Sequence, residues 1–567
     1  MRSCLFMSFA MMLLQTVPAA GQTPLYGQLE ISINNANSYS NPFDMNEIEL
    51  VGTFTRPGGG DVVVSGFYDG DGSGGQAGNV WKVRFMPSEE GEWSYSLSWG
   101  GSGTPGLADS GTFIVVGSTK HGLLKQNSSN PRYFEHMDGT DFYPRIYYLS
   151  QLFTPDSDVL WKTNGTDLYF GGFYDFNLAI TTFWQGDNIV ANGWNAWTDT
   201  YQPGSVTFNS LGTYPVNGCA STGCSAGQSH DRLDLASWHT LETRLVDLEA
   251  KGVIWHDFDG IFPNVAGALH QRPQPEQETF VRNYIARLAA YWNVVWQLCF
   301  ECDEFLTDSQ VGMWLQFVER HDPYDHMITV HDRSIATDFP ETDATAVQDT
   351  RGEISNSKRN YDTVTSAFNS RNKPVICMEC SWEGPADNKL DGNGIRTGAW
   401  GVALGGAAYN YAEQFAQSNP SDFRYGDGAG FPYVEIMHDF LETLPYFEMS
   451  PGPGLVSGNA GAIAFAKPGS DYVVQLQNGG TVNVDLTAAN QALAVSWLDP
   501  RLGTLIENDP VEIDGGSVMQ FSAPDTRDWV LVIRAPEPHA VPSVLAALAT
   551  LWLCYQRRTC ESKARSL

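Results

Sequence analysis

The chain has 567 residues, of which 42% are apolar, so it is long enough for several domains with hydrophobic cores. Its 65 acidic residues outnumber its 33 basic residues, and the formal net charge is −32 at pH 7. Because phosphate binding needs a basic face, this balance excludes nucleic acid as a general partner, and we attribute the acidity to solubility.

The first residues have the pattern of a secretory signal peptide. Arg2 provides a short basic region, Leu5–Leu14 is apolar, and Ala19–Gly21 offers a cleavage site of small residues. The segment 1–21 is too short to span a bilayer. We therefore expect an exported protein.

Residues 22–118 and 447–535 are predicted to form two β-sandwiches. Short runs with alternating polarity, such as Asp61–Phe67 and Asp471–Leu476, are separated there by turn residues. The sequence DGDGS from Asp69 has some features of a calcium loop but lacks the rest of an EF-hand, and we interpret it as a plain turn.

Residues 119–446 alternate between strand and helix patterns, which predicts a (β/α)₈ barrel between the two sandwiches. The predicted helices include Leu233–Lys251 and Glu276–Tyr291. The predicted strands are Phe142–Tyr148, Leu178–Trp184, Gly252–Phe258, Asn293–Glu301, Met327–His331, Ala344–Gln348, Pro374–Glu379 and Val402–Tyr409.

Two of these strands run directly into acidic residues. Glu301 follows a buried apolar run, Glu379 ends another strand, and Glu383 lies just behind it. Barrel enzymes place their chemistry at the carboxyl ends of the strands. If strand alternation continues to their ends, Glu301 and Glu379 face each other across the barrel mouth. A pair of carboxylates suits acid/base or nucleophilic work on a glycosidic bond.

Glu301 and Glu379 each lie within a Cys-x-x-Cys sequence. The four cysteines are Cys299, Cys302, Cys377 and Cys380. We reject a zinc site, because residues three apart on a strand point to opposite faces, and we expect small buried thiols. A local disulfide is expected between Cys219 and Cys224, which lie in a loop rich in Gly and Ser.

The barrel sequence resembles clan A glycoside hydrolases and, more closely, the apiosidase-like barrels. NVVWQLCFECDE (293–304) and KPVICMECSWEG (373–384) are similar to their strand-four and strand-seven motifs, and 396–411 to their strand-eight region. The resemblance covers roughly residues 127–444 and implies that Glu301 is the general acid/base and Glu379 the nucleophile, with Glu383 as a competing nucleophile. One departure is Phe300, which stands where that family has an Asn that contacts the sugar 2-hydroxyl.

The flanking regions also resemble known modules. WKVRFMPSEEGEWSY in the first sandwich is similar to an uncharacterised module that often precedes such barrels. VSWLDPRLG and DWVLVI in the second are similar to a module named for collagen binding, which we expect to be a packing or sugar-binding accessory. The segment 536–567 resembles the bacterial PEP-CTERM sorting signal, with Pro-Glu-Pro, an apolar run and a basic end.

Several further side chains are candidates for substrate binding. Trp184, Trp194 and Trp197 follow the second strand, where they could stack on sugar rings or pack the loop, and we weigh the two equally. The polar candidates at the other strand ends are His256, Asp257, His331, Glu383 and Arg396. Nothing in their spacing requires a metal.

These observations predict a secreted or cell-surface glycoside hydrolase that cleaves a plant or algal polysaccharide by a retaining mechanism. We expect a monomer with no cofactor and no metal, and membrane or cell-surface attachment through the tail. One alternative is a carbohydrate-binding or adhesion protein on a catalytically inactive barrel. Another is a polysaccharide lyase, which would need a Tyr or Lys base in place of the paired carboxylates.

Overall fold

The computed structural model describes residues 22–102, 106–148, 176–181, 197–199, 208–209, 214–215, 228–233, 235–258, 260–262, 269–331, 339–348, 356–384, 389–413 and 428–536. These residues form two compact units, which divide after residue 346. The predicted signal peptide, the Cys219–Cys224 pair and the tail beyond residue 536 lie outside the described residues. Within the part that the structure describes, none of the helices is long and apolar enough to cross a membrane.

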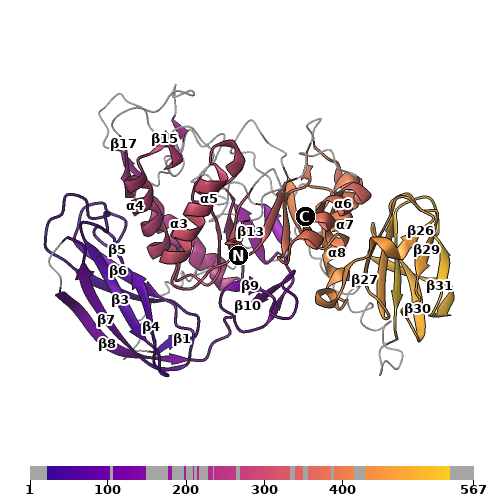
Figure 1. The fold of residues 1–567 in the computed structure, drawn as a ribbon, viewed down its shortest axis with the longest axis horizontal. Helices are drawn as coiled ribbons and strands as arrows, with labels where there is room; N and C mark the ends of the chain where they lie inside the picture. Colours follow the sequence, from indigo (N-terminus) through magenta and orange to yellow (C-terminus); the bar gives the residue numbers. More distant parts are fainter. Residues whose placement is uncertain are drawn as a thin grey trace, which may run out of the picture. The chain divides into compact units, whose positions relative to one another are not determined.

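The first unit begins with the predicted β-sandwich (Figure 1). One sheet has the order β1-β8-β7-β3-β4 and the other the order β2-β6-β5. Alternation sets the core, since every second residue of Glu49–Thr55 is buried, and Phe54 stacks on Phe85 with ring centroids 3.9 Å apart. The strands are β1 (Gln22–Pro24), β2 (Leu29–Asn34), β3 (Glu49–Thr55), β4 (Asp61–Ser65), β5 (Phe67–Tyr68), β6 (Val80–Phe85), β7 (Gly91–Gly100) and β8 (Gly106–Val116).

The middle of the chain forms a nearly closed parallel barrel, and all eight predicted strands belong to it. The strand order is β20-β19-β18-β13-β12-β24-β22-β21. All residues of β19 and β22 are buried, as expected for parallel strands that are covered on both faces. The strands are β12 (Ile146–Tyr148), β13 (Leu178–Thr181), β18 (Ile254–Asp257), β19 (Val294–Gln297), β20 (Ile328–Thr329), β21 (Thr345–Gln348), β22 (Val375–Glu379) and β24 (Ala407–Glu413).

Short strands accompany the barrel. They are β9 (Leu124–Gln126), β10 (Phe134–His136), β11 (Asp141–Phe142), β14 (Trp197–Asp199), β15 (Phe208–Asn209), β16 (Tyr214–Pro215), β17 (Gln228–Leu233) and β23 (Trp382–Glu383). The strands β9 to β11 form a small sheet of their own, which precedes the first barrel strand along the chain.

The helices that alternate with the strands are α3 (Leu235–Ala250), α4 (Gln274–Leu288), α5 (Asp308–His321), α6 (Ser357–Ser370), α7 (Gly392–Leu404) and α8 (Phe431–Leu441). One predicted boundary is wrong, because the strand expected from Val402 is still helix α7 there and β24 starts only at Ala407. The turn between them needs Gly406, whose φ is +87° and whose Cβ position would lie 2.6 Å from the Phe368 ring.

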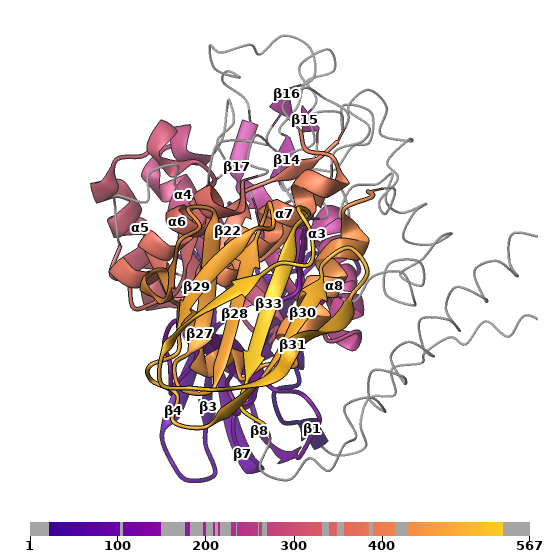
Figure 2. The ribbon, with the colours of Figure 1, turned by 90° about the vertical axis from the view of Figure 1, so that its right-hand side faces the viewer.

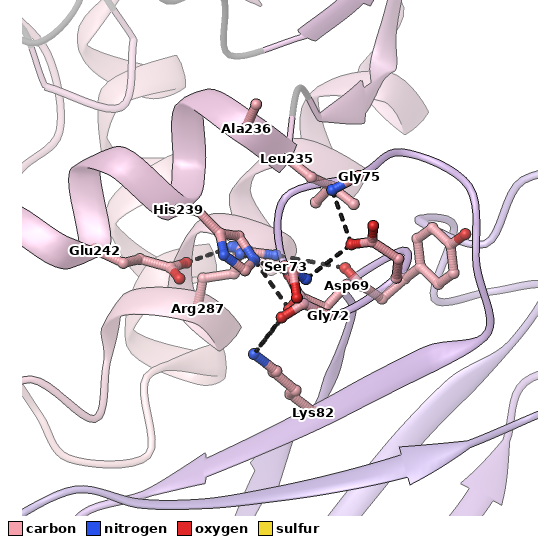
Figure 3. Close-up of polar contacts among 12 residues, drawn as sticks. Asp69, Gly72, Ser73, Gly75, Lys82, Leu235, Ala236, His239, Glu242 and Arg287 are labelled. Carbon is pink, nitrogen blue, oxygen red and sulfur yellow. Dashed lines mark hydrogen bonds and ion pairs between the residues drawn. The ribbon is translucent and has the colours of Figure 1, made fainter. Parts of the chain in front are cut away.

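A buried ion network joins the first sandwich to the barrel helices α3 and α4 (Figure 3). Arg84 of β6 donates to Glu242 of α3 at 2.7 Å, and Arg287 of α4 donates to Glu242 at 2.6 Å and to Asp69 at 2.9 Å. Burial favours the neutral form of Glu242, but the charges of Arg287 and Arg84 outweigh it and lower the pKa to about 2. Glu242 therefore remains ionised between the two arginines.

The DGDGS loop of the sandwich is a turn at the edge of this network. Oδ1 of Asp71 accepts hydrogen bonds from the N–H groups of Ser73 and Gly75 at 2.8 and 2.9 Å (Figure 3). Asp69 is fully buried and pairs with Lys82 and His239 as well as with the network. The DGDGS segment therefore forms a turn, as predicted.

The second unit contains α6, α7, α8 and the predicted C-terminal β-sandwich, whose strands are seen in Figure 2. Its sheets have the orders β25-β27-β28-β33-β30-β31 and β26-β29-β32. The predicted run Asp471–Leu476 is strand β28, whereas Val518–Ser522 is largely exposed and lacks a clear apolar pattern. The strands are β25 (Ser450–Pro451), β26 (Val456–Ser457), β27 (Ala462–Lys467), β28 (Asp471–Leu476), β29 (Thr481–Asp485), β30 (Ala492–Asp499), β31 (Thr504–Asp514), β32 (Val518–Ser522) and β33 (Trp529–Arg534).

Hydrogen bonds and ion pairs join this sandwich to the helices α6 and α7. The hydroxyl of Tyr361 in α6 donates to the carbonyl of Ala464 at 2.8 Å. Arg396 of α7 forms two hydrogen bonds to Asp528, at 2.8 and 3.1 Å, and both side chains are buried. The sandwich is therefore packed on the barrel helices of its own unit through buried polar contacts.

Candidate active site

Glu301 lies on a turn just beyond β19 and is 4% exposed. The strand ends at Gln297, and Cys299 forms a single parallel bridge to Phe262. Glu301 then adopts the left-handed conformation, with φ 48° and ψ 51°, and begins a short 3₁₀ turn over Cys302–Glu304. The predicted alternation from Val295 to Glu301 is therefore wrong, because the chain has turned before it reaches the carboxylate.

The turn at Glu301 is braced by His331. The N–H of Cys302 donates to the carbonyl of His331 at 3.1 Å, and the N–H of His331 donates to the carbonyl of Cys299 at 3.1 Å. The ring of Phe300 stacks on the His331 imidazole at 4.9 Å and lies 4.8 Å from the ring of Phe258. The candidate residue His331 thus contacts the Glu301 turn directly, and Phe300 fills the space beside it.

Glu379 is the last residue of β22 and is 6% exposed. The strand is fixed by its parallel ladder with β24, in which Cys377 is opposite Tyr409, and by a 2.7 Å hydrogen bond from Asn410 Nδ2 to the carbonyl of Met378. Ser381 is held by a 3.1 Å hydrogen bond to the Tyr409 hydroxyl. The residues on each side of Glu379 are therefore tied to one neighbouring strand, β24.

The four cysteines around the two glutamates form two disulfides. Cys299 is bonded to Cys302, with their Cα atoms 5.5 Å apart, and Cys377 is bonded to Cys380, with Cα atoms 5.6 Å apart. The expectation of free thiols is therefore wrong. It assumed an extended strand, but the chain turns after Leu298 and again after Glu379, which brings each pair of sulfur atoms together.

Glu383 is buried in β23, and its carboxylate is fully engaged inside the second unit. The hydroxyl of Tyr411 donates to Oε2 at 2.6 Å, and the N–H of Gly430 donates to both oxygens at 3.0 Å. Burial raises the pKa of Glu383, and these hydrogen bonds only partly offset it. The carboxylate thus anchors the residue that precedes helix α8, which is a structural task.

His256 and Asp257 follow each other on β18 and point to opposite faces of the barrel wall. Nε2 of His256 lies 2.8 Å from Oγ1 of Thr329, and burial, followed by the nearby His331, lowers the pKa of His256 to about 3. His256 is therefore neutral. Asp257 accepts a 3.4 Å hydrogen bond from Tyr284 of α4, so it belongs to the strand–helix layer, and its predicted place at the mouth is wrong.

The remaining candidates are dispersed. Arg396 lies in helix α7 and not at a strand end as expected, and its hydrogen bonds go to Asp528 and Asn393. Trp184 and Trp194 lie outside the described residues. Trp197 starts β14, where it is opposite Leu233 of β17, but its side chain is not described.

Sequence reasoning missed the two disulfides and the ring of Phe258. The repeated sequence Cys-x-Glu-Cys was a usable signal for the disulfides, because it encloses both glutamates in the same way. Within the described residues, no group of three or more His, Cys, Asp or Glu side chains is arranged to hold a metal ion.

Three regions of the chain match known sequence families. Residues 246–413 match the sequence profile described as "Apiosidase-like, catalytic domain". Residues 22–100 match "Domain of unknown function (DUF5060)", and residues 456–534 match "Putative collagen-binding domain of a collagenase". Among curated proteins, no sequence matches this chain significantly.

Solved structures share the fold. One from Bacteroides vulgatus, described as a "putative glycoside hydrolase", is 20% identical with a TM-score of 0.68, over 91% of this chain and 99% of that chain. A glycoside hydrolase family 5 structure from the same organism is 15% identical with a TM-score of 0.52, over 73% of this chain and 94% of that chain. The barrel fold and the match to a glycosidase catalytic domain together make this protein a glycoside hydrolase.

Proposed function

We propose that the barrel cleaves a glycosidic bond with retention of configuration, with Glu301 as general acid/base and Glu379 as nucleophile. The observation that supports this assignment is the position of the two carboxylates. Glu301 lies just beyond the carboxyl end of β19, Glu379 is the last residue of β22, and both are almost completely buried. Glycosidases of this fold react at that end of the barrel with a pair of carboxyl groups.

In the proposed mechanism the reaction has two steps. Glu301 gives its proton to the leaving oxygen while a carboxylate oxygen of Glu379 attacks the anomeric carbon, so the glycosidic bond breaks and a glycosyl ester forms. Glu301, now ionised, then takes a proton from water, and the resulting attack on the anomeric carbon releases the sugar and Glu379. Retention requires a separation of about 5–5.5 Å between the carboxyl groups, because the nucleophile must reach carbon directly.

The proposed substrate is a plant or algal polysaccharide outside the cell. The signal-like residues 1–21 support export, and the Pro-Glu-Pro, apolar and basic pattern of residues 536–567 supports a location at the cell surface. We propose a polymer because accessory sandwiches flank the barrel on both sides in the sequence.

The mechanism is tested with a panel of polysaccharides and aryl glycosides, followed by two variants. Glu379→Ala is expected to lower kcat on the order of 10⁴-fold or more, because the nucleophile is lost. Azide should restore turnover and give a glycosyl azide of inverted configuration. Glu301→Ala is expected to lower kcat about 10²–10⁴-fold on substrates with poor leaving groups, since only these need protonation. With this variant, azide should give a product of retained configuration.

Asp303→Asn is the matched control, because this exposed carboxylate lies two residues from Glu301. It should leave kcat within about twofold of the wild type, as expected for a solvated charge. The assignment would be overturned by full activity in either glutamate variant, or by a wild-type product of inverted configuration.

A further inference from the structure

Both candidate catalytic glutamates occupy the same position in a small covalent ring. The sequences are Cys299-Phe300-Glu301-Cys302 and Cys377-Met378-Glu379-Cys380, and in each the glutamate directly precedes the second cysteine. Each pair of cysteines is joined by a disulfide. All four cysteines are at most 1% exposed. The first ring follows β19 and the second lies at the end of β22, so the two disulfides are independent features of the chain.

We propose that these two disulfides are positioning elements of the active site. Cys299–Cys302 sets the direction of the Glu301 carboxyl, and Cys377–Cys380 sets that of Glu379. This inference rests on the proposed function for the roles of the two glutamates. It adds four residues that do not touch the substrate but act through those that do.

The backbone of Glu301 shows why the first ring is needed. Its φ of 48° is unfavourable for a residue with a Cβ atom, and Glu301 is one of three non-glycine residues with positive φ in the described part of the chain. Such a conformation persists only where the surroundings impose it. Here the disulfide closes the turn, and the two backbone hydrogen bonds to His331 hold its ends.

The second ring has a different task, because Glu379 still belongs to a strand. The ladder with β24 fixes the chain as far as Cys377, and the hydrogen bond from Asn410 fixes the carbonyl of Met378. The β22 ladder ends at Cys377, and the chain is held to β24 again only from Ser381 onward, by its hydrogen bond to Tyr409 and by the pairing of β23. The Cys377–Cys380 disulfide ties residue 380 back to the strand and so limits the rotation of Glu379.

Such restraint is expected to matter for the rate. A displacement of about 1 Å in a reacting group can cost about 100-fold in catalysis, because the attack geometry is lost. Loss of a disulfide should therefore lower kcat more than it weakens binding, since the sugar is held by other side chains. The two rings should also produce different kinetic signatures, because they hold groups with different roles.

The test uses two double variants of the full chain, Cys299→Ala with Cys302→Ala and Cys377→Ala with Cys380→Ala. Each should lower kcat about 10- to 100-fold while KM changes less than about threefold. The 299/302 variant should be impaired on poor leaving groups and nearly normal on dinitrophenyl glycosides, and the basic limb of its pH profile should move. The 377/380 variant should be impaired on both substrates, and the acidic limb should move.

Cys219→Ala with Cys224→Ala is the matched control, because it removes another closely spaced pair outside the two rings. It should retain the leaving-group dependence of the wild type. Unchanged kcat and pH profile in the two ring variants would overturn the inference. The inference would also be overturned if the cysteines at positions 299, 302, 377 and 380 reacted with a maleimide in the denatured, unreduced protein, because they would then be free thiols.

Two further measurements cover failed folding and failed activity. If a variant does not fold, the wild type is reduced in graded steps instead. We expect kcat to be proportional to the fraction of the protein whose disulfides remain oxidised, while the circular dichroism spectrum stays constant. If the wild type hydrolyses nothing on the panel, the proposed function fails on its own. Crystal structures of the variants then test the positioning, and an unchanged Glu301 conformation with positive φ would refute it.

Discussion

The carboxylate of Glu383 is held by two hydrogen-bond donors. Its oxygens accept hydrogen bonds from Tyr411 and from the N–H of Gly430, so they are not free to attack a sugar without releasing both donors. The competing assignment of Glu383 as nucleophile is therefore less favoured by its contacts. Glu379 has the strand-end position that the mechanism requires.

Glu383→Gln should separate the two assignments. The amide oxygen can still accept a hydrogen bond, so we expect kcat within about tenfold of the wild type and no azide-dependent product. Glu383→Ala should lower the free energy of unfolding by about 1–3 kcal/mol, because Tyr411 and Gly430 lose their acceptor. Steady-state rates and urea unfolding measure these effects. A 10⁴-fold loss in Glu383→Gln with rescue of Glu383→Ala by azide would make Glu383 the nucleophile.

At the residue scale, the sequence predicted the two candidate glutamates but not their surroundings. Glu301 and Glu379 could be found because an apolar run that ends in an acid needs no tertiary information. Asp257 was misplaced because alternation assigns neighbouring residues to opposite faces, and the sequence did not say which face was inside. Arg396 was misplaced because its partner, Asp528, lies 132 residues further along the chain.

At the scale of elements, the seam between the first sandwich and the barrel depends on charges that are buried together. Glu242 of α3 lies between Arg84 of β6 and Arg287 of α4, and Asp69 is the second acceptor of Arg287. Removing one partner of a buried ion pair leaves an uncompensated charge. Such a network therefore makes the seam sensitive to single substitutions and to acid.

Glu242→Gln is expected to lower the free energy of unfolding by about 3–5 kcal/mol at pH 7, because two buried arginines lose their charged acceptor. The pKa of Glu242 is about 2 in the folded protein and about 4.5 when exposed, so its contribution is present above pH 4.5 and is lost as the pH falls toward 2. Melting temperatures at several pH values should show the variant and the wild type converging in acid.

Glu30→Gln is the control for this comparison. Glu30 also pairs with Arg84, but 32% of its side chain is exposed, so solvent screens the interaction and the loss should stay below about 1 kcal/mol. Equal losses in the two variants would show that burial does not decide the strength of these pairs.

Most elements were predictable because each depends on a local pattern. The barrel strands are apolar runs bounded by turns, and the sandwich strands alternate. The seam was not predictable, since Arg84 and Glu242 are 158 residues apart and nothing local marks them as partners. The α7–β24 boundary failed because a run rich in Gly and Ala fits a helix and a strand equally well.

At the scale of the whole molecule, a buried cluster around Asp528 binds the C-terminal sandwich to helix α7 of its unit. Asp528 receives hydrogen bonds from Arg396 of α7 and from Arg501 of the sandwich. Asp528→Ala should lower the free energy of unfolding of this unit by about 3–5 kcal/mol, because Arg396 would remain buried without its charged partner. Differential scanning calorimetry should show an earlier transition for this unit.

Glu448→Gln is the control, because it removes only an ion pair with Lys467 at the surface. Its melting temperature should be close to that of the wild type. Limited proteolysis gives an independent reading, since loss of the Asp528 contacts should expose cleavage sites around residues 442–456. A normal melting profile for Asp528→Ala would contradict a structural role for the cluster.

The division of the chain into compact units does not follow the division into sequence families. The catalytic-domain match ends at residue 413 and the next begins at residue 456, yet α6 and α7 belong with the later sandwich. A gene rearrangement that exchanged only residues 456–534 would leave Tyr361 and Arg396 facing a foreign surface. Chimeric enzymes should therefore keep α6, α7 and the sandwich together, with the junction placed upstream of residue 356.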